Sequence, residues 1–330
     1  ILTENYGCVA CPIRCGREVA FDNIAGAGPE YETIGMLGSN CLVNDLKDIA
    51  RAADICNRYG LDTISTGAAV AFAMELFDRG IVTEKEIGFP LNWGDGKAMI
   101  RIVEAMGKRE GLGAILSLGT RKAAEIIGHG AERYAIHVKG LDLPAHDPRC
   151  YKSLAAGYAT SSRGACHLSG YTYACERNAT YKDFGITEVL DRAIDDGKGE
   201  LNVPFQNFMG VLDSLKICKF PILACVSIDD LLTWIHGVTG WEMTRKELEE
   251  TGKRIFTLKR LFNSRCGFTK DDDTLPERIL HEPRGTGGAA DTLPDLQKQL
   301  ECYYAARGWD EKGIPTYEQL KKLGIEEFAL

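Results

Sequence analysis

Residues 7–19 read GCVACPIRCGREV and place three cysteines, Cys8, Cys11 and Cys15, in a C-x2-C-x3-C spacing. A redox dithiol needs two thiols rather than three, and zinc tends to take its ligands as two separated pairs. Iron–sulfur clusters bind a run of closely spaced thiolates plus one distant thiolate. The spacing therefore favours a cluster over zinc, although it leaves a zinc-stabilised helical scaffold open. It does not choose a fourth ligand among the nine other cysteines, twelve minus three.

The composition is that of an ordinary globular protein, with 45% hydrophobic and 26% charged residues, and a length of 330 residues predicts two domains. The net charge of −8 and the lack of a basic stripe argue against nucleic acid as a partner. We find neither a signal peptide nor an apolar run near the roughly 18 residues of a membrane span, so we expect a cytoplasmic protein without membrane contact. Because the first residue is Ile1 rather than methionine, we expect that an upstream part is missing.

Twelve cysteines without an export signal are expected to be reduced rather than paired as disulfides. Cys218, in DSLKICKF, lies among charged and apolar residues, and the local sequence alone favours a buried helix cysteine. Eight others are also interpreted as small buried packing residues, namely Cys41, Cys56, Cys150, Cys166, Cys175, Cys225, Cys266 and Cys302.

Helical patterns dominate the sequence, and the strand patterns at 81–89 and 134–139 are short and weak. Within the longest predicted helix, Leu248, Ile255, Leu258 and Phe262 are expected to face inward. The predicted helices are 45–59, 68–78 with a cap at Ser65 or Thr66, 97–109, 120–127, 244–265, 295–307 and 316–323. We therefore predict a mainly α, multihelical protein with a few short strands. The Pro- and Asp-rich stretch 140–149, GLDLPAHDPR, is the expected junction between domains 1–140 and 141–330.

Longer motifs along nearly the whole chain resemble the tungsten-dependent aldehyde:ferredoxin oxidoreductases. They are GCVACPIRCGR, GPEYETIGMLGSN, CNRYGLDTISTG, GYATSSRGACHLSGY, DSLKICKF and FNSRCGFTKDDDTLPERIL. The resemblance implies the two helical C-terminal domains of that family, without its mostly β N-terminal domain that helps to bind the pterin cofactor. It also implies a 4Fe–4S cluster held by Cys8, Cys11, Cys15 and Cys218, the last lying 203 residues beyond Cys15 (218 − 15).

Next to the cluster the resemblance implies a bis-pyranopterin centre that carries tungsten or molybdenum. Its pterin contacts would come from Asn57, Leu61 and Asp62 in NRYGLD, and from Asp213 and Ile217 in DSLKIC. Both segments depart from the D-x-x-G-L-D pattern of the family. Asn57 replaces an acidic residue, and Lys216 stands where the motif has glycine.

Two further residues match the pair that flanks the metal in the aldehyde-oxidising enzymes, Glu32 in EYET and His167 in GACHL. Each taken alone is more often a surface carboxylate or a core histidine, and it is the long motifs around them that favour catalysis. Small residues precede His167, which would let backbone approach a bulky cofactor.

The resemblance implies oxidation of an aldehyde to a carboxylic acid, with electrons passed to ferredoxin or another carrier, and a homodimer is among the assemblies it implies. We expect the chain alone, without the N-terminal domain, to be inactive. Two other functions stay open: the tungsten subunit of an acyl-CoA reductase of the benzoyl-CoA type, and an electron-transfer module that keeps only the cluster.

Overall fold

Helix dominates the structure, as the sequence predicts. The computed structural model describes residues 1–330 and contains seventeen α-helices but only five short strands. None of the helices combines the length and the hydropathy that crossing a lipid bilayer requires. The chain divides into two compact units, Ile1–Ala145 and His146–Leu330, which are described separately below. The domain boundary predicted after residue 140 stays a prediction, because two compact units are not by themselves shown to be independently folding domains.

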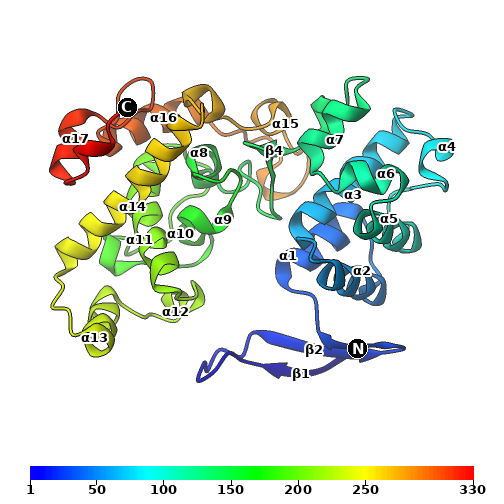
Figure 1. Cartoon of the computed structure of the whole chain (residues 1–330), viewed down its shortest axis with the longest axis horizontal. Helices are drawn as coiled ribbons and strands as arrows, with labels where there is room; N and C mark the ends of the chain where they lie inside the picture. The colour runs from blue at the N-terminus through cyan, green and yellow to red at the C-terminus, as the bar shows by residue number, and fades with distance from the viewer. The chain divides into compact units, whose positions relative to one another are not determined.

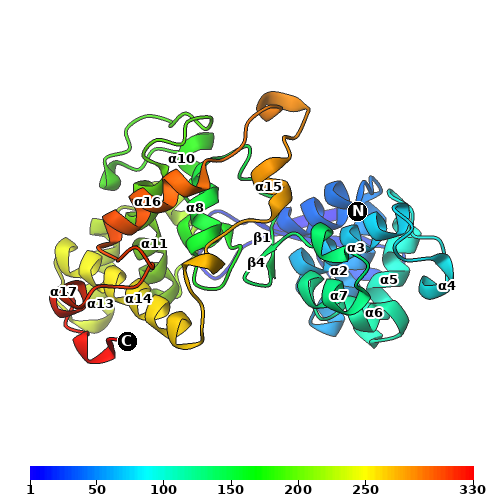
Figure 2. The same ribbon diagram turned by 90° about the horizontal axis from the view of Figure 1, so that it is seen from above.

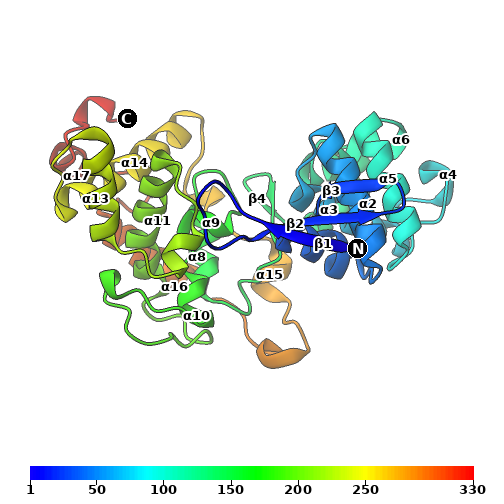
Figure 3. The same ribbon diagram turned by 90° about the horizontal axis from the view of Figure 1, so that it is seen from below.

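Unit 1 begins with a three-stranded antiparallel sheet of β1 (Leu2–Tyr6), β2 (Gly16–Phe21) and β3 (Ile24–Ala27), in that order. Its first strand is exposed along its whole length. The pairing of Tyr6 with Gly16 closes the loop that joins β1 to β2. Figure 3 shows this loop extending beyond the ends of both strands. The three N-terminal cysteines lie within it.

A helical layer forms the core of unit 1, with α3 (Thr63–Asp78) at its centre (Figure 1). The helix α3 is buried on most of its surface, which suits its run of alanines and other apolar residues. Around it lie α2 (Leu46–Tyr59), α5 (Gly96–Lys108), α6 (Gly111–Leu116) and α7 (Thr120–Ile127). A short helix α1 (Tyr31–Thr33) runs directly into a π-helix (Ile34–Gly38) and a 3-10 turn (Ser39–Cys41).

Close backbone contact fixes this π-helix against α3. A Cβ added at Gly67 of α3 would lie 2.6 Å from the carbonyl carbon of Met36, so only glycine allows the approach. The thiol of Cys41 donates to the carbonyl oxygen of Met36 at 3.3 Å and to that of Gly67 at 3.6 Å. Thr33 and Thr63 share a hydrogen bond of 2.9 Å between their hydroxyls. These contacts hold the segment that carries Glu32.

Unit 2 is built around α11 (Lys198–Leu215), which packs against α8 (Ser153–Thr160), α9 (His167–Gly170), α14 (Arg245–Arg265) and α16 (Leu296–Arg307). Figure 1 labels all five helices, and Figure 2 shows α8, α11, α14 and α16 from above. Buried polar side chains tie these helices together. The guanidinium of Arg307 donates to Gln206, whose amide in turn donates to the hydroxyl of Thr160. The other helices of the unit are α10 (Tyr173–Arg177), α12 (Phe220–Leu223), α13 (Ile228–Thr239), α15 (Glu277–His281) and α17 (Tyr317–Lys322).

Most predicted helices appear within a few residues of their predicted limits, but four details of the prediction were wrong. Residues 81–89 contain a helix, α4 (Glu84–Ile87), instead of a strand, because Thr83 and Glu86 form a capping box. The helix α3 is capped by Asp62, whose carboxylate accepts from the N–H of Ser65 at 2.8 Å, so it begins earlier than predicted. Phe262 is 68% exposed instead of facing inward.

The fourth detail concerns the cysteines that were interpreted as buried packing residues. Four of the eight are buried, and two are half-buried. The two exceptions, Cys225 and Cys266, are exposed because they lie in turns that follow helix ends, where few side chains can cover them. Cys218 is exposed as well, which overturns the local reading of it as a buried helix cysteine.

Candidate functional site

The loop between β1 and β2 presents three thiols from nine residues, 7–15. Cys8 is exposed, Cys11 and Cys15 are half-buried, and none of the three is in a disulfide. The N–H of Cys11 donates to the carbonyl oxygen of Cys8 at 3.0 Å, which makes a tight turn of the first pair. Ala10 and Arg14 adopt left-handed backbone conformations, with φ of 58° and 49°.

This loop fits a metal–sulfur group. Free thiols are soft ligands that bind zinc, copper(I) or iron–sulfur clusters, and they cannot be explained here as disulfide partners. Left-handed residues such as Ala10 and Arg14 occur in the type of backbone turn whose successive N–H groups bind anionic centres such as cluster sulfides. The side chain of Arg14 donates to the backbone carbonyl oxygen of Asn5 at 2.5 Å. The side chain of Arg17 donates to the backbone carbonyl oxygen of Cys15 at 2.7 Å, so side-chain hydrogen bonds hold both ends of the loop.

Glu32 lies in α1 and is half-buried. Its Oε2 accepts a hydrogen bond of 2.8 Å from the backbone N–H of Ala145, at the other end of the same unit. The backbone contact between Gly67 and Met36 fixes the π-helix that follows it. The carboxylate of Glu32 is therefore oriented both by its own hydrogen bond and by the packing of the segment behind it.

The first segment implied for pterin binding forms the junction of α2 and α3. Asn57 is exposed in the last turn of α2, and Gly60 ends that helix with a left-handed φ of 68°. The N–H of Leu61 returns to the carbonyl oxygen of Cys56 at 2.8 Å, which completes a common glycine-terminated helix end. Asp62 then begins α3 as its N-cap. Two helix termini thus bring Asn57, Leu61 and Asp62 together within six residues.

Asp142 of β5 (Leu141–Asp142) lies behind this junction as a buried carboxyl. Burial raises the pKa of Asp142 to about 6, and the nearby charge of Asp62 acts in the same direction. Hydrogen bonds from the hydroxyls of Thr120 and Ser65 oppose the rise without cancelling it. No sequence motif surrounds Asp142, so its buried position could not be predicted from its neighbours in the chain.

The second segment implied for pterin binding forms the end of α11. Lys216 is the left-handed residue that ends this helix, with φ of 59°. Glycine adopts this conformation without steric strain, which explains why the family motif has glycine here. A lysine at this position is conformationally less favourable. Asp213 pairs with the amine of Lys219, which is 8% exposed. The carboxylate of Asp213 therefore neutralises a largely buried cation while 56% of its side chain faces solvent.

Cys218 follows this helix end directly and is exposed, two residues after Lys216. Burial raises the pKa of the phenol of Tyr171, and the charge of Cys218 acts in the same direction. Asp213, in the last turn of α11, and Ile217 and Cys218, just after it, are thus brought together at the C-terminal end of this helix. The convergence of Cys218 with the three thiols of the N-terminal loop stays a prediction.

His167 begins the short helix α9 and is half-buried. Before it, every residue of α8 is buried, and the small side chains there let this helix pack closely against its neighbours. The imidazole of His167 lies beside that of His146, with 4.8 Å between ring centroids, and the ring of Tyr173 lies 4.4 Å from that of His146. His146 is only 7% exposed.

No motif in the sequence marks His146, which lies in the stretch 140–149 that predicts a junction between domains. The available signal was weak: a single histidine in a proline-rich stretch, shortly before the small-residue segment that leads to His167. The pairing of Lys219 with Asp213 was not predicted either. No periodic pattern could have revealed either residue, since both lie outside regular helices.

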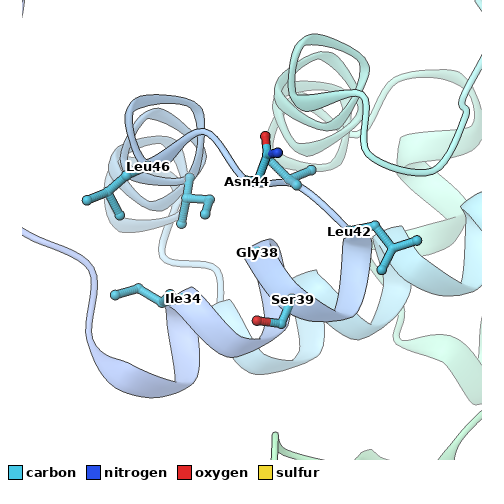
Figure 4. A pocket seen from close by; sticks show the side chains of 8 residues that line it. Ile34, Gly38, Ser39, Leu42, Asn44 and Leu46 are labelled. Carbon is cyan, nitrogen blue, oxygen red and sulfur yellow. The ribbon is translucent and has the colours of Figure 1, made fainter. Parts of the chain in front are cut away.

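Unit 1 also contains a pocket of about 420 Å³ beside the π-helix (Figure 4). Apolar side chains form most of its lining, including Ile34, Leu42 and Leu46, and the polar groups are those of Ser39 and Asn44. None of the predicted site residues lines this pocket. We therefore do not include it in the candidate site.

The fold and the loop define a multihelical protein that carries three free thiols close together in sequence. Comparison with known proteins agrees with this class. The model of the family described as aldehyde ferredoxin oxidoreductase, domains 2 and 3, matches residues 1–325. The chain therefore belongs to the aldehyde ferredoxin oxidoreductase family, and its class is that of the oxidoreductases.

Three individual relatives, all oxidoreductases by name, illustrate the similarity. The chain is 37% identical over 332 residues to the tungsten-containing aldehyde ferredoxin oxidoreductase of Pyrococcus furiosus, which covers 99% of the chain and 53% of the relative. It is 36% identical to the enzyme of the same name from Thermococcus kodakarensis, with the same coverage. It is also 32% identical to the WOR-like subunit of an aliphatic sulfonate oxidoreductase of Pyrococcus furiosus, over 98% of the chain and 50% of that subunit.

Among solved structures, the fold resembles a chain of the active-site complex BamBC of benzoyl-coenzyme A reductase with 1,5-dienoyl-CoA. The TM-score is 0.76 at 24% identity, and the likeness covers 99% of this chain and 53% of that chain. At this identity the likeness concerns the fold. In all these comparisons the chain spans about half the length of the relatives it matches.

Proposed function

We propose that this chain is the helical part of a tungsten-dependent enzyme that oxidises an aldehyde with water to a carboxylic acid. The reaction is RCHO + H₂O → RCOOH + 2H⁺ + 2e⁻, with the electrons leaving to ferredoxin or another carrier. The observation that carries the proposal is the 37% identity over 99% of the chain to a tungsten-containing aldehyde ferredoxin oxidoreductase. The three free thiols of one loop support the cluster that such electron transfer needs.

The residues that would hold the cofactors are those of the two units described above. Cys8, Cys11, Cys15 and Cys218 would bind a 4Fe–4S cluster. Asn57, Leu61, Asp62, Asp213 and Ile217 would contact the pterins. When bound, the tungsten bis-pterin centre supplies the two-electron oxidation, and the cluster supplies one-electron transfer to the carrier.

Charge supports this assignment of the second pterin segment. The carboxylate of Asp213 is paired with the amine of Lys219, and it would accept a hydrogen bond from a pterin amino group. Asn57, in the first segment, is uncharged, and its amide oxygen can accept a similar but weaker hydrogen bond. The two pterins would therefore be held unequally.

The proton chemistry would be carried by Glu32 and His167. The N–H of Ala145 orients the carboxylate of Glu32, which would take a proton from water or from the hydrated aldehyde. The imidazole of His167 would donate a hydrogen bond to the substrate oxygen and stabilise the negative charge that develops there. The remaining part of the protein, a pterin-binding domain, would complete the site, and a homodimer is one assembly we propose to test.

A cytoplasmic location fits the thiol chemistry. All twelve cysteines are free, as expected in a reducing compartment, and an exposed thiol such as Cys8 would oxidise readily elsewhere. Free thiols in a reducing compartment could bind zinc as well as an iron–sulfur cluster. Metal analysis therefore has to distinguish zinc from iron.

The test uses the full-length protein with Glu32→Gln, assayed by aldehyde-dependent reduction of a viologen dye and by metal analysis. We expect tungsten and iron contents to stay unchanged while most turnover disappears. Glu30→Gln is the matched control, because Glu30 is an exposed glutamate two residues away. Full activity of the Glu32→Gln protein would reject the base assignment. Acyl-CoA reduction without aldehyde oxidation by the unmodified protein would replace the proposed reaction with the reductase alternative.

A further inference from the structure

His146 occupies a confined position among aromatic rings in unit 2. Its ring centroid lies 4.8 Å from that of His167 and 4.4 Å from that of Tyr173, whereas the rings of His167 and Tyr173 are 6.3 Å apart. His146 therefore contacts both rings more closely than they contact each other. Tyr151 and Tyr171 pack against Tyr173 from behind, with centroids 6.0 and 5.4 Å away.

The backbone of His146 is anchored independently of its ring. The hydroxyl of Tyr158, a fully buried residue of α8, donates to the carbonyl oxygen of His146 at 2.9 Å. The next residue, Asp147, accepts the N–H of Arg149 with its carboxylate at 2.8 Å and the N–H of Cys150 with its carbonyl oxygen at 2.9 Å. Its carboxylate also binds the guanidinium of Arg149. A fixed backbone and a crowded ring leave the His146 imidazole little freedom.

Packing alone does not require a histidine at position 146. A phenylalanine would fill the same space among rings at a lower desolvation cost, because an imidazole buries two polar nitrogens. Ring nitrogens of His146 and His167 lie within 4.8 Å of each other, a span that a direct hydrogen bond or one bridging water covers. A hydrogen bond at one imidazole nitrogen fixes the tautomer and the orientation of the ring that it contacts.

We propose that His146 is a positioning residue that fixes the orientation and tautomer of His167 through its ring nitrogens. The proposal rests on the proposed function in one respect, that His167 donates to the substrate oxygen. A donor helps catalysis only when it points to where charge develops, so an imidazole that rotates or changes tautomer would lose most of its effect. The pairing of the two imidazoles itself does not depend on any cofactor.

The first experiment uses the 330-residue chain labelled with ¹⁵N-histidine and records long-range ¹H–¹⁵N spectra of the imidazole rings. His167→Gln assigns the signal of His167 among the six histidines of the chain. In the unmodified chain we expect one tautomer of His167. In His146→Phe, which keeps a flat ring but removes both nitrogens, we expect the mixture of tautomers typical of a free imidazole. His146→Gln, which keeps a polar end, should restore the single tautomer at least in part.

His281→Gln is the matched control, because His281 is an exposed histidine of the same unit, 3.2 Å from the carboxylate of Glu277. It should leave the spectrum of His167 unchanged. An unchanged His167 spectrum in a folded His146→Phe chain, with folding verified by circular dichroism, would overturn the proposal. So would a change of equal size in the control.

The second experiment measures the full-length enzyme. Removing one oxyanion donor typically lowers kcat about 100-fold to 1000-fold, so misorienting it should cost about 10-fold or more, with KM changed less than about twofold. We expect His146→Phe to show this loss and His146→Gln to recover part of it. Unchanged kcat in His146→Phe would overturn the proposal, whereas full activity of His167→Gln would reject the proposed function and leave the NMR result standing.

Discussion

Replacing the buried carboxyl of Asp142 by an amide should change how the stability of the chain depends on pH. Asp142 is 2% exposed, and burial raises its pKa from 3.8 to about 6. Unfolding returns the carboxyl to its ordinary pKa. Between about pH 4 and about pH 6, the folded chain therefore binds more protons at this site than the unfolded chain. The free energy of unfolding must then fall as pH rises through this range.

The size of the effect follows from the two pKa values. Their difference is about 2.2, from about 6 and 3.8, and at 1.36 kcal/mol for each pH unit this gives about 3 kcal/mol. Asp142→Asn removes the ionisable proton but keeps an oxygen that accepts from the hydroxyl of Thr120. The variant should therefore match the unmodified chain near pH 4 and exceed its stability by up to about 3 kcal/mol at pH 7.

The assay is urea unfolding of the chain, followed by circular dichroism at a series of pH values between 4 and 7.5. Asp78→Asn serves as the control, because Asp78 is exposed at the end of α3 and its replacement should give a difference that is nearly independent of pH. A constant difference between Asp142→Asn and the unmodified chain would refute the reasoning. Lower stability of Asp142→Asn at pH 7 would refute it more strongly.

Two further predictions concern packing and thiol reactivity. Gly67→Ala should destabilise the chain by about 1–3 kcal/mol, because its Cβ would meet the backbone of Met36 at 2.6 Å, whereas Gly237→Ala, with no atom within 4 Å, should stabilise it by up to about 1 kcal/mol in the same urea assay. With iodoacetamide at pH 8, mass spectrometry should find Cys41 unmodified and Cys225 alkylated, since burial raises the pKa of Cys41 to about 12 and Cys225 is exposed. Destabilisation by Gly237→Ala, or rapid labelling of Cys41 in the folded chain, would contradict these two arguments.

Local sequence signals predicted the longer helices of unit 1, α2, α3, α5 and α7, because start or stop residues flank them in the sequence. The carboxylate of Asp45 accepts the N–H groups of Lys47 and Asp48, and Gly60 ends the same helix in a left-handed conformation. The short helix α4 has a comparable start signal, the capping box of Thr83 and Glu86. The apolar residues around it nevertheless suggested a strand. Capping chemistry was the better guide there.

The N-terminal sheet and the π-helix could not be predicted in this way. All five residues of β1 are exposed, so the strand has no alternation of buried and exposed positions to recognise. The π-helix depends on the contact of Gly67 with Met36, which lie 31 residues apart (67 − 36) and become neighbours only in the fold. Such contacts leave no trace in a short sequence window.

The longest helix, α14, shows why the inward face was partly misassigned. Arg260, a charged residue that a hydropathy pattern places outside, is 3% exposed and paired with Asp273. Phe262 faces solvent while Leu261 is buried. The buried face of this helix therefore includes a charged residue, which its ion pair with Asp273 makes possible. The site residues proposed from the long motifs stay predictions, whereas the proximity of His146 to His167 required coordinates that place the two rings side by side.

The central claim is that Cys8, Cys11, Cys15 and Cys218 together bind one 4Fe–4S cluster. The most direct test measures iron, zinc and acid-labile sulfide, with EPR of the reduced state, in the full-length protein carrying Cys218→Ala. Cys225→Ala is the control, because Cys225 is an equally exposed thiol seven residues further on (225 − 218). We predict about four iron and four sulfide per chain in the unmodified protein and in the control, and loss of that EPR signal in Cys218→Ala. An intact cluster in Cys218→Ala, or one zinc per chain in place of iron, would contradict the claim.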